Sequence, residues 1–199
     1  MSWDESQAIK QSAGDKGSKV HQAIGDLLDG RDVAMDAKYI NRTTGLPEEL
    51  TLEEYECLMA FRDWWAGVLP TPTVIAREFV LWGDGYAGTG DLLCTIKGEP
   101  WLIDLKTSQY VWPEHELQVS AYKRALPPPW ATPAPKLGIL QVGYRANKRK
   151  WKLTEVADQY DLFLSAKAIW AKETEGTEVF QRDYPLRLSL GIPEPAATP

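Results

Sequence analysis

A turn sequence between two apolar segments constrains the fold of this 199-residue chain more than any other feature. Residues 97–100 (KGEP) have the composition of a tight turn. The flanking segments, residues 92–96 and 101–106, are apolar and rich in strand-forming residues, so they are predicted to pair as a β-hairpin. This hairpin would bring Asp91 and Asp104 close together at its open end.

The second predicted strand carries a carboxylate and an ammonium group on one face. Side chains alternate along a strand, so Asp104 and Lys106 point one way and Leu105 points into the core. Asp104 and Asp91 would repel each other unless a cation lies between them, and Mg²⁺ or Mn²⁺ would remove that repulsion and bridge to a phosphate. Lys106 would then face the scissile phosphate or the attacking water. The alternative is a surface ion pair between Asp104 and Lys106, which contributes little to stability.

The Asp-x-Lys triplet is weak evidence when taken alone. A chain of this length is expected to contain about one such triplet by chance, and a second copy occupies residues 36–38. The copy at residues 104–106 differs because it follows the apolar run 101–103 and because Asp91 precedes it behind the glycine-rich residues 88–90.

Five sequence signatures occur in one order along the chain. They are Gly17-Ser18-Lys19-Val20-His21, Glu78, Gly88-x-x-Asp91, Ile103-Asp104-Leu105-Lys106-Thr107 and Gln118-x-x-x-Tyr122. Together they resemble the RecB-like nucleases of the PD-(D/E)XK superfamily, over about residues 10–170. The resemblance implies an α/β fold of the restriction-endonuclease-like type, with a central mixed β-sheet flanked by helices, and metal-dependent hydrolysis of DNA.

The resemblance also implies a set of metal ligands. His21, Asp91 and Asp104 would hold the cation, with the carbonyl of Leu105 as a further ligand. An imidazole beside two carboxylates would favour Mn²⁺ more than a site lined by oxygen alone. The alternative for His21 is a hydrogen-bonded structural histidine.

Further residues receive catalytic or nucleic-acid-binding roles from the same resemblance. Glu78 would reach the metal or its water, and Lys106 would position the water or stabilise the developing negative charge. Gln118 and Tyr122, which share one face of a predicted helix, would contact the nucleic-acid backbone or orient the site. The alternatives are an exposed strand glutamate for Glu78, and a solvent-facing glutamine with a half-buried tyrosine for the pair.

Cysteine content separates this chain from some of the proteins it resembles. Certain relatives bind an iron-sulfur cluster through four cysteines, whereas this chain has only Cys57 and Cys94, so we expect no cluster. Both cysteines are expected to be small buried apolar residues in a reducing compartment.

The charge balance argues against a molecule that attracts DNA over its whole surface. With 22 basic and 28 acidic residues the formal net charge is −6, so binding would need a local positive groove. Lys148, Arg149 and Lys150, within the most basic segment of the chain, are candidate phosphate contacts, although such a run is also typical of a solvated turn. Weak intrinsic affinity would fit tethering to a recombination partner protein or assembly into a homo-oligomer.

Local patterns predict the remaining elements of a single domain over residues 1–190, with a disordered Pro-rich tail at 191–199. Helices are expected at residues 6–28, 51–68, 113–125 and 158–172; strands at 73–82, 86–96, 101–106, 136–144 and 151–153; and an irregular loop at 127–135. Tyr110 and Trp112 fall in the loop before the third helix, where they would either pack in the core or stack on an unpaired base. No apolar run is long enough to cross a bilayer and the N-terminus is unlike a secretory signal, so a cytoplasmic location without membrane contact is expected.

The sequence therefore predicts a Mg²⁺- or Mn²⁺-dependent DNA exonuclease that serves recombination or DNA end processing. Two alternatives stay open at this stage. One is a structure-specific endonuclease, and the other is a catalytically silent nuclease-fold module that binds DNA or a recombination partner.

Overall fold

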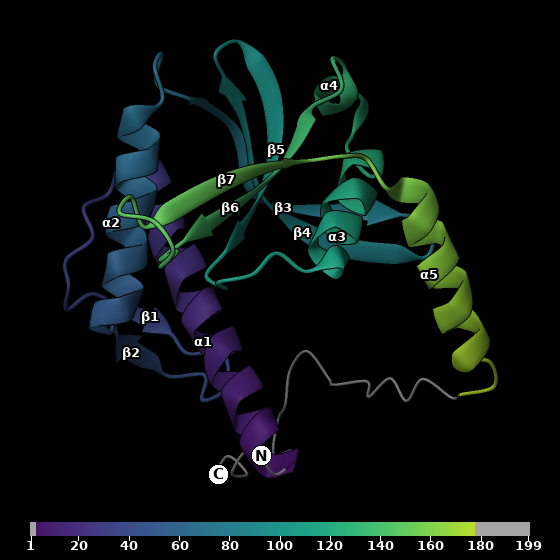
Figure 1. The fold of residues 1–199 in the computed structure, drawn as a ribbon, viewed down its shortest axis with the longest axis horizontal. Helices are drawn as coiled ribbons and strands as arrows, with labels where there is room; N and C mark the ends of the chain where they lie inside the picture. Colours follow the sequence, from purple (N-terminus) through teal and green to yellow (C-terminus); the bar gives the residue numbers. More distant parts are fainter. Residues whose placement is uncertain (1–2, 178–199) are drawn as a thin grey trace, which may run out of the picture.

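Five strands form one mixed sheet whose order follows the chain, β3-β4-β5-β6-β7 (Figure 1). The computed structural model describes residues 3–177. The strands are β3 (Thr73–Gly83), β4 (Tyr86–Ile96), β5 (Glu99–Lys106), β6 (Lys136–Val142) and β7 (Trp151–Val156). Neighbouring strands are antiparallel except for β5 and β6, which are parallel because the helix α3 (Pro113–Arg124) lies in the connection between them.

The hairpin predicted around residues 97–100 is confirmed as β4 and β5. Ile96 pairs with Glu99, and the two residues between them, Lys97 and Gly98, both have positive φ angles of 53° and 83°. Such angles suit a two-residue hairpin turn, because this turn matches the right-handed twist of the strands. The register runs on to Leu92 opposite Ile103, so the next position along each strand is occupied by an aspartate.

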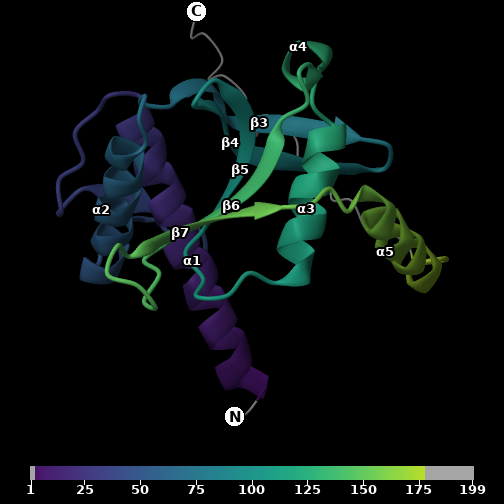
Figure 2. The ribbon, with the colours of Figure 1, turned by 45° about the horizontal axis from the view of Figure 1, so that its top comes forward.

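Helices cover both faces of the sheet (Figure 2). The helices α1 (Trp3–Leu28) and α2 (Leu52–Gly67) lie on one face, where Val20, Ile24, Phe61 and Trp64 pack against Ile103 and Leu140 among other buried residues. On the opposite face Val119 of α3 packs with Phe79, Leu81, Leu93, Leu102 and Leu137. The helix α5 (Tyr160–Glu173) then lies against α3, where Lys123 forms an ion pair with Asp158 and Arg124 lies over the ring of Tyr160. The predicted α/β class with a central mixed sheet and flanking helices is therefore confirmed.

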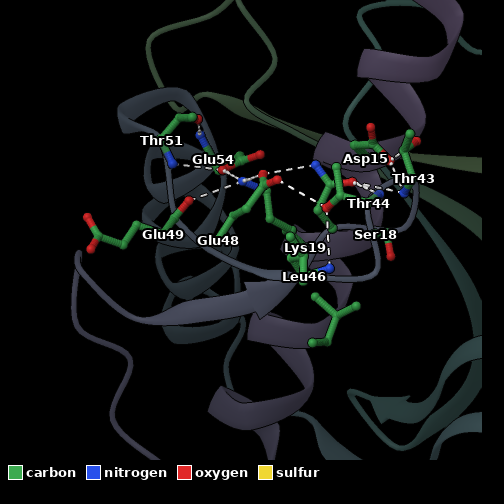
Figure 3. A network of polar contacts seen from close by, with 12 residues as sticks. Asp15, Ser18, Lys19, Thr43, Thr44, Leu46, Glu48, Glu49, Thr51 and Glu54 are labelled. Carbon is green, nitrogen blue, oxygen red and sulfur yellow. Dashed lines mark hydrogen bonds and ion pairs between the residues drawn. The ribbon is translucent and has the colours of Figure 1, made fainter.

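A buried ion pair joins α1 to the start of α2 (Figure 3). The Nζ atom of Lys19 lies 2.9 Å from Oε2 of Glu54, and both side chains are about 95 % buried, with exposed fractions of 5 % and 4 %. Glu54 also accepts a hydrogen bond of 2.7 Å from the backbone N–H of Thr51, which completes the predicted capping box of α2. Lys19 is two residues before His21, so this ion pair fixes the position of the helical turn that carries His21.

Several element bounds differ from the prediction for local reasons. The segment before α2 contains a small hairpin of β1 (Lys38–Ile40) and β2 (Pro47–Glu49). The region 127–135, predicted to be irregular, contains the short helix α4 (Pro128–Ala131), since proline is tolerated in the first helical turn. The strand predicted to reach residue 144 ends at Val142, because Gly143 has a φ of +71°. The tail predicted at 191–199 lies outside the described residues.

The predicted burial of both cysteines is confirmed. Cys57 and Cys94 are fully buried, and burial raises the pKa of their thiols to about 11 and about 12. Trp64 is also buried. Among residues 3–177, every helix is either too short or too polar to cross a membrane.

Candidate metal centre

Three side chains from three elements converge near the carboxyl end of β5. They are His21 of α1, Glu78 of β3 and Asp91 of β4, and one ligand atom of each lies within 4.8 Å of the other two. The Nδ1 atom of His21 is 3.4 Å from Oδ1 of Asp91 and 3.9 Å from Oε1 of Glu78. Within residues 3–177, this is the one group of histidine, cysteine and acidic side chains arranged to hold a metal ion.

The backbone of Leu105 orients two of these three side chains. Its N–H donates a 2.7 Å hydrogen bond to Oδ2 of Asp91, and its carbonyl oxygen lies 3.1 Å from Nε2 of His21. With the proton on Nε2, the imidazole donates to that carbonyl and its Nδ1 lone pair faces the two carboxylates. The Leu105 side chain is 2 % exposed and packs in the core, as predicted, so the strand that holds both groups is itself fixed.

The acidic groups at this centre perturb one another. Burial raises the pKa of Glu78, and the nearby charge of Asp91 raises it further. For His21, burial lowers the pKa, but the hydrogen bond and charge of Asp91 together with the charges of Glu78 and Asp104 outweigh that effect, so the pKa lies above its ordinary value. Positive charge is therefore favoured at this position, as expected where carboxylates are crowded together.

Glu78 has an unusual backbone conformation for a residue within a strand. Its φ angle is +44°, in the left-handed region that only glycine adopts readily. Its neighbours Arg77 and Phe79 pair with Leu92 and Gly90, so Glu78 stands opposite Asp91 between two paired positions. Left-handed backbone at a non-glycine residue costs about 1–3 kcal/mol and persists where surrounding structure imposes it, which is a common feature of functional sites.

Asp104 and Lys106 form a second, adjacent charged pair. The Nζ atom of Lys106 lies 2.7 Å from Oδ2 of Asp104, whose side chain is 5 % exposed, so this is not the surface ion pair considered from the sequence. Burial raises the pKa of Asp104 to about 6, in opposition to the nearby ammonium group. Within the described part of the chain, its Oδ2 atom has no hydrogen-bond partner of good geometry besides this ionic contact. Asp104 lies outside the group of three ligand atoms, although its charge acts on His21.

Gln118 and Tyr122 of α3 lie behind Lys106. Lys106 donates to Oε1 of Gln118 at 3.4 Å, and Nε2 of Gln118 donates to the hydroxyl of Tyr122 at 2.9 Å. Neither residue lines the cleft described below, so in this structure the pair holds Lys106 in position. A Cβ atom at Gly88 would overlap the Tyr122 hydroxyl. This overlap explains why the first position of the Gly-x-x-Asp signature is a glycine.

The centre opens into a cleft of about 1500 Å³ that runs along α1. Lys10, Gly14, Gly17 and His21 all line it, because these spacings of three and four residues place side chains on one face of a helix. The six cationic residues of the lining are Lys10, Lys16, Arg42, Arg77, Lys106 and Arg145, against the three acidic residues Asp26, Glu78 and Asp91. Four of these cations are paired with acidic side chains outside the lining: Lys16 and Arg145 with Glu53, Arg77 with Asp29, and Lys106 with Asp104. Among the described residues, Lys10 and Arg42 are the lining cations without an ion-pair partner.

The structure does not bring the predicted phosphate contacts of the basic segment to this cleft. Lys148, Arg149 and Lys150 are exposed in the turn between β6 and β7, and the guanidinium of Arg149 lies over the ring of Trp151 at 5.5 Å. Arg145, at the start of the same segment, does line the cleft.

Most of the cationic lining residues could not be found from the sequence. Lys10, Lys16, Arg42 and Arg77 stand singly, without a motif around them. The available signal was the helical spacing from Lys10 through Gly14 and Gly17 to His21, which places the cation and the imidazole on the same face.

Comparison with protein-family models and with curated proteins finds no match for this chain.

Proposed function

We propose that the chain is a divalent-metal-dependent nuclease of the RecB-like, restriction-endonuclease-like type, and that it hydrolyses phosphodiester bonds of DNA. The observation that carries this proposal is the group of three ligand atoms from His21, Glu78 and Asp91, next to the Asp104–Lys106 pair in a cleft lined by six cationic residues.

The residues at the centre fit a hard divalent cation. Two carboxylates and one imidazole offer ligand atoms within 4.8 Å of each other, and their mutual repulsion is what a bound cation removes. Asp104, whose buried Oδ2 atom is paired with Lys106, lies outside this group of three and adds a nearby negative charge. Oxygen donors suit Mg²⁺ and Mn²⁺, and the imidazole shifts the preference toward Mn²⁺. A bound cation would supply positive charge to a phosphate oxygen and lower the pKa of a water molecule.

The remaining residues of the site have roles that follow from their positions. The Lys106 ammonium group, 3.4 Å from Gln118 Oε1, is directed by α3 and would stabilise negative charge as it develops on the phosphate. The Leu105 peptide holds the Asp91 carboxylate and the His21 ring. Cations such as Lys10 and Arg42, which have no ion-pair partner within the described part of the chain, are available to substrate phosphates.

We further propose that hydrolysis begins at DNA ends, in recombination or end processing. The test is a time course with purified full-length chain on end-labelled linear DNA and on covalently closed circular DNA, with Mg²⁺, Mn²⁺ or EDTA. Linear DNA should be shortened progressively with either metal and remain intact in EDTA. Digestion of the closed circle would identify an endonuclease instead.

A matched pair of variants makes the assignment specific. Asp91→Asn should abolish hydrolysis, whereas Asp36→Asn, in the second Asp-x-Lys triplet of the chain, should leave it unchanged because Asp36 is exposed and lies outside the group of ligand atoms. DNA binding without hydrolysis by the unmodified protein would overturn the nuclease proposal and favour a binding module.

A further inference from the structure

Two exposed aromatic rings stand beside the cleft in the segment between β5 and α3. Tyr110 is 69 % and Trp112 51 % exposed, so the core packing considered for them from the sequence is wrong. Their ring centroids are 5.8 Å apart with an interplanar angle of 51°. Trp112 lines the cleft that holds the metal centre.

The backbone that carries these rings is held in place. Gln109 donates to the carbonyl of Gly143 at 3.0 Å and accepts from the N–H of Arg145 at 2.8 Å. Gln141 donates to the carbonyl of Ser108 at 2.9 Å. Trp112 is the N-cap residue of α3, and its N–H donates to Nδ1 of His115 while its carbonyl accepts from the N–H of His115. The rings are therefore presented by an ordered segment, and a ligand that uses them pays little ordering entropy.

Trp112 differs from the other aromatic residues that could face a ligand. The other aromatic residue of the cleft lining, Tyr39, is 9 % exposed and donates its hydroxyl proton to Asp26 at 2.9 Å. Trp82 on β3 and Trp170 on α5 are more exposed than Trp112, but neither lines the cleft. Among the described residues, Trp112 is therefore the exposed aromatic side chain that lines the same cleft as the candidate metal centre.

We propose that Tyr110 and Trp112 form a stacking site for unpaired bases, and that the strand entering the cleft is single-stranded DNA. This inference rests on the proposed nuclease function and names its substrate class. The faces of bases within a duplex are covered by their neighbours, whereas unpaired bases stack on aromatic side chains without regard to sequence. A base inserted between the two rings would need a van der Waals separation on each side, or about 7–8 Å between the rings. The ring centroids are only 5.8 Å apart, so bases stack on the outer faces of the rings.

The charge of the cleft fits the same ligand. Lys10 of α1 and Arg42, which follows β1, line the cleft without an ion-pair partner among the described residues, and a cationic groove next to an aromatic surface is the usual arrangement for binding single strands. Phosphates would follow the cations, while the bases contact Tyr110 and Trp112.

The experiment is an anisotropy titration of the full-length chain against a labelled 12-nucleotide oligothymidylate and a labelled blunt-ended duplex without unpaired bases, in EDTA so that hydrolysis cannot occur. Trp112→Ala and Tyr110→Ala should each weaken single-strand binding by about 5- to 150-fold and change duplex binding less than about twofold. Trp112→Phe should retain most of the affinity, and Trp82→Ala should behave as the unmodified protein.

The outcomes separate this inference from the proposed function. Equal losses on single strand and duplex, or no loss on either, would overturn the stacking site whatever the protein hydrolyses. Trp112-dependent binding of the single strand, without hydrolysis of any DNA in Mn²⁺, would sustain the stacking site and overturn the nuclease proposal. Stronger binding of the duplex than of the single strand by the unmodified protein would reject single-stranded DNA as the substrate.

Discussion

The Nε2 atom of His21 lies 3.1 Å from the carbonyl oxygen of Leu105, although 84 positions separate the two residues along the chain. The same residue of β5 donates its N–H to Asp91. One peptide segment at the end of a buried strand therefore sets the direction of two ligand groups from two other elements. Ligands fixed in this way are pre-organised, which is what tight metal binding requires.

Removing either of these ligands should weaken metal binding. In calorimetric titrations with Mn²⁺, His21→Ala and Asp91→Asn should lower the affinity at least about tenfold, since each deletes a ligand atom from the group of three. Asp36→Asn is the control, because it removes one acidic charge at an exposed position away from the cleft. An unchanged titration for His21→Ala would make this histidine a structural residue that only bonds to Leu105.

Lys106→Ala should separate metal binding from turnover. Its ammonium group is bound to Asp104 and Gln118 and is not a metal ligand, so the affinity for Mn²⁺ should change less than about threefold while the hydrolysis rate falls about 10²- to 10³-fold. Single-turnover rates and Mn²⁺ titrations on the same preparation check this. Gln118→Ala, which frees the Lys106 side chain but keeps its ammonium group, and which also removes the hydrogen bond to Tyr122, should lower the rate less. Equal loss of affinity and rate in Lys106→Ala would contradict the assigned role.

Local sequence patterns were enough to predict the five strands of the main sheet and the four longer helices, but not the β1–β2 hairpin or the short helix α4. The turn at 97–100 and the capping box at Thr51 and Glu54 depend on residues within a few positions of each other, and both are confirmed. The pair Lys19–Glu54 could not be predicted, because its partners are 35 positions apart and each resembles an ordinary surface residue. Lys19 belongs to the sequence signature around His21, yet residues two apart on a helix point about 200° from each other, and of the two only His21 reaches the metal centre.

The candidate site was likewise predicted only where its geometry follows from local sequence patterns. Strand alternation placed Asp104 and Lys106 on one face, and the hairpin brought Asp91 toward them. The left-handed φ of Glu78 has no local signal in the sequence, since glutamate rarely adopts it and tertiary structure imposes it here.

The strain at Glu78 should invert the usual order of two substitutions. Within a strand, glycine is less stable than alanine by about 0.5–1 kcal/mol. At a φ of +44° the Cβ atom is disfavoured by about 1–2 kcal/mol, so Glu78→Gly should be more stable than Glu78→Ala by about 1 kcal/mol. Urea unfolding of the two variants measures the difference. The control is Val80→Gly against Val80→Ala, because Val80 lies on the same strand and does not have a positive φ angle. Greater stability of Glu78→Ala would mean that the strand is unstrained.

The ion pair of Arg77 with Asp29 should make stability depend on acid pH. The Arg77 side chain donates to Asp29 Oδ1 at 2.7 Å, and this hydrogen bond and the Arg77 charge hold the pKa of Asp29 below its ordinary value. A carboxyl group whose pKa is lower in the folded state stabilises the fold above about pH 4 and loses that contribution as the pH falls through the folded-state pKa. Asp29→Asn should therefore reduce the free energy of unfolding at pH 7, and this reduction should shrink as the pH is lowered below about 4. A loss that stays the same size across this range would show that the charge of Asp29 is not responsible.

The buried pair of Lys19 and Glu54 makes a stability prediction of the opposite kind (Figure 3). Lys19→Met leaves the buried Glu54 carboxylate without its ammonium partner, so the free energy of unfolding should fall by about 3–5 kcal/mol. Lys16→Met on the same helix removes a partner of Glu53 whose side chain is 59 % exposed, and it should have little effect.

A double variant identifies the cause of the loss at Lys19. In Lys19→Met with Glu54→Gln, the amide oxygen can still accept the hydrogen bond from Thr51 that closes the capping box, but no charge is left buried. Most of the stability lost in Lys19→Met should therefore return. Urea unfolding of the unmodified protein, Lys19→Met, Glu54→Gln and the double variant measures this. If the double variant is no more stable than Lys19→Met, the loss comes from packing and from the hydrogen bond of Lys19 to the Glu49 carbonyl, because the carboxylate of Glu54 would then have had no part in it.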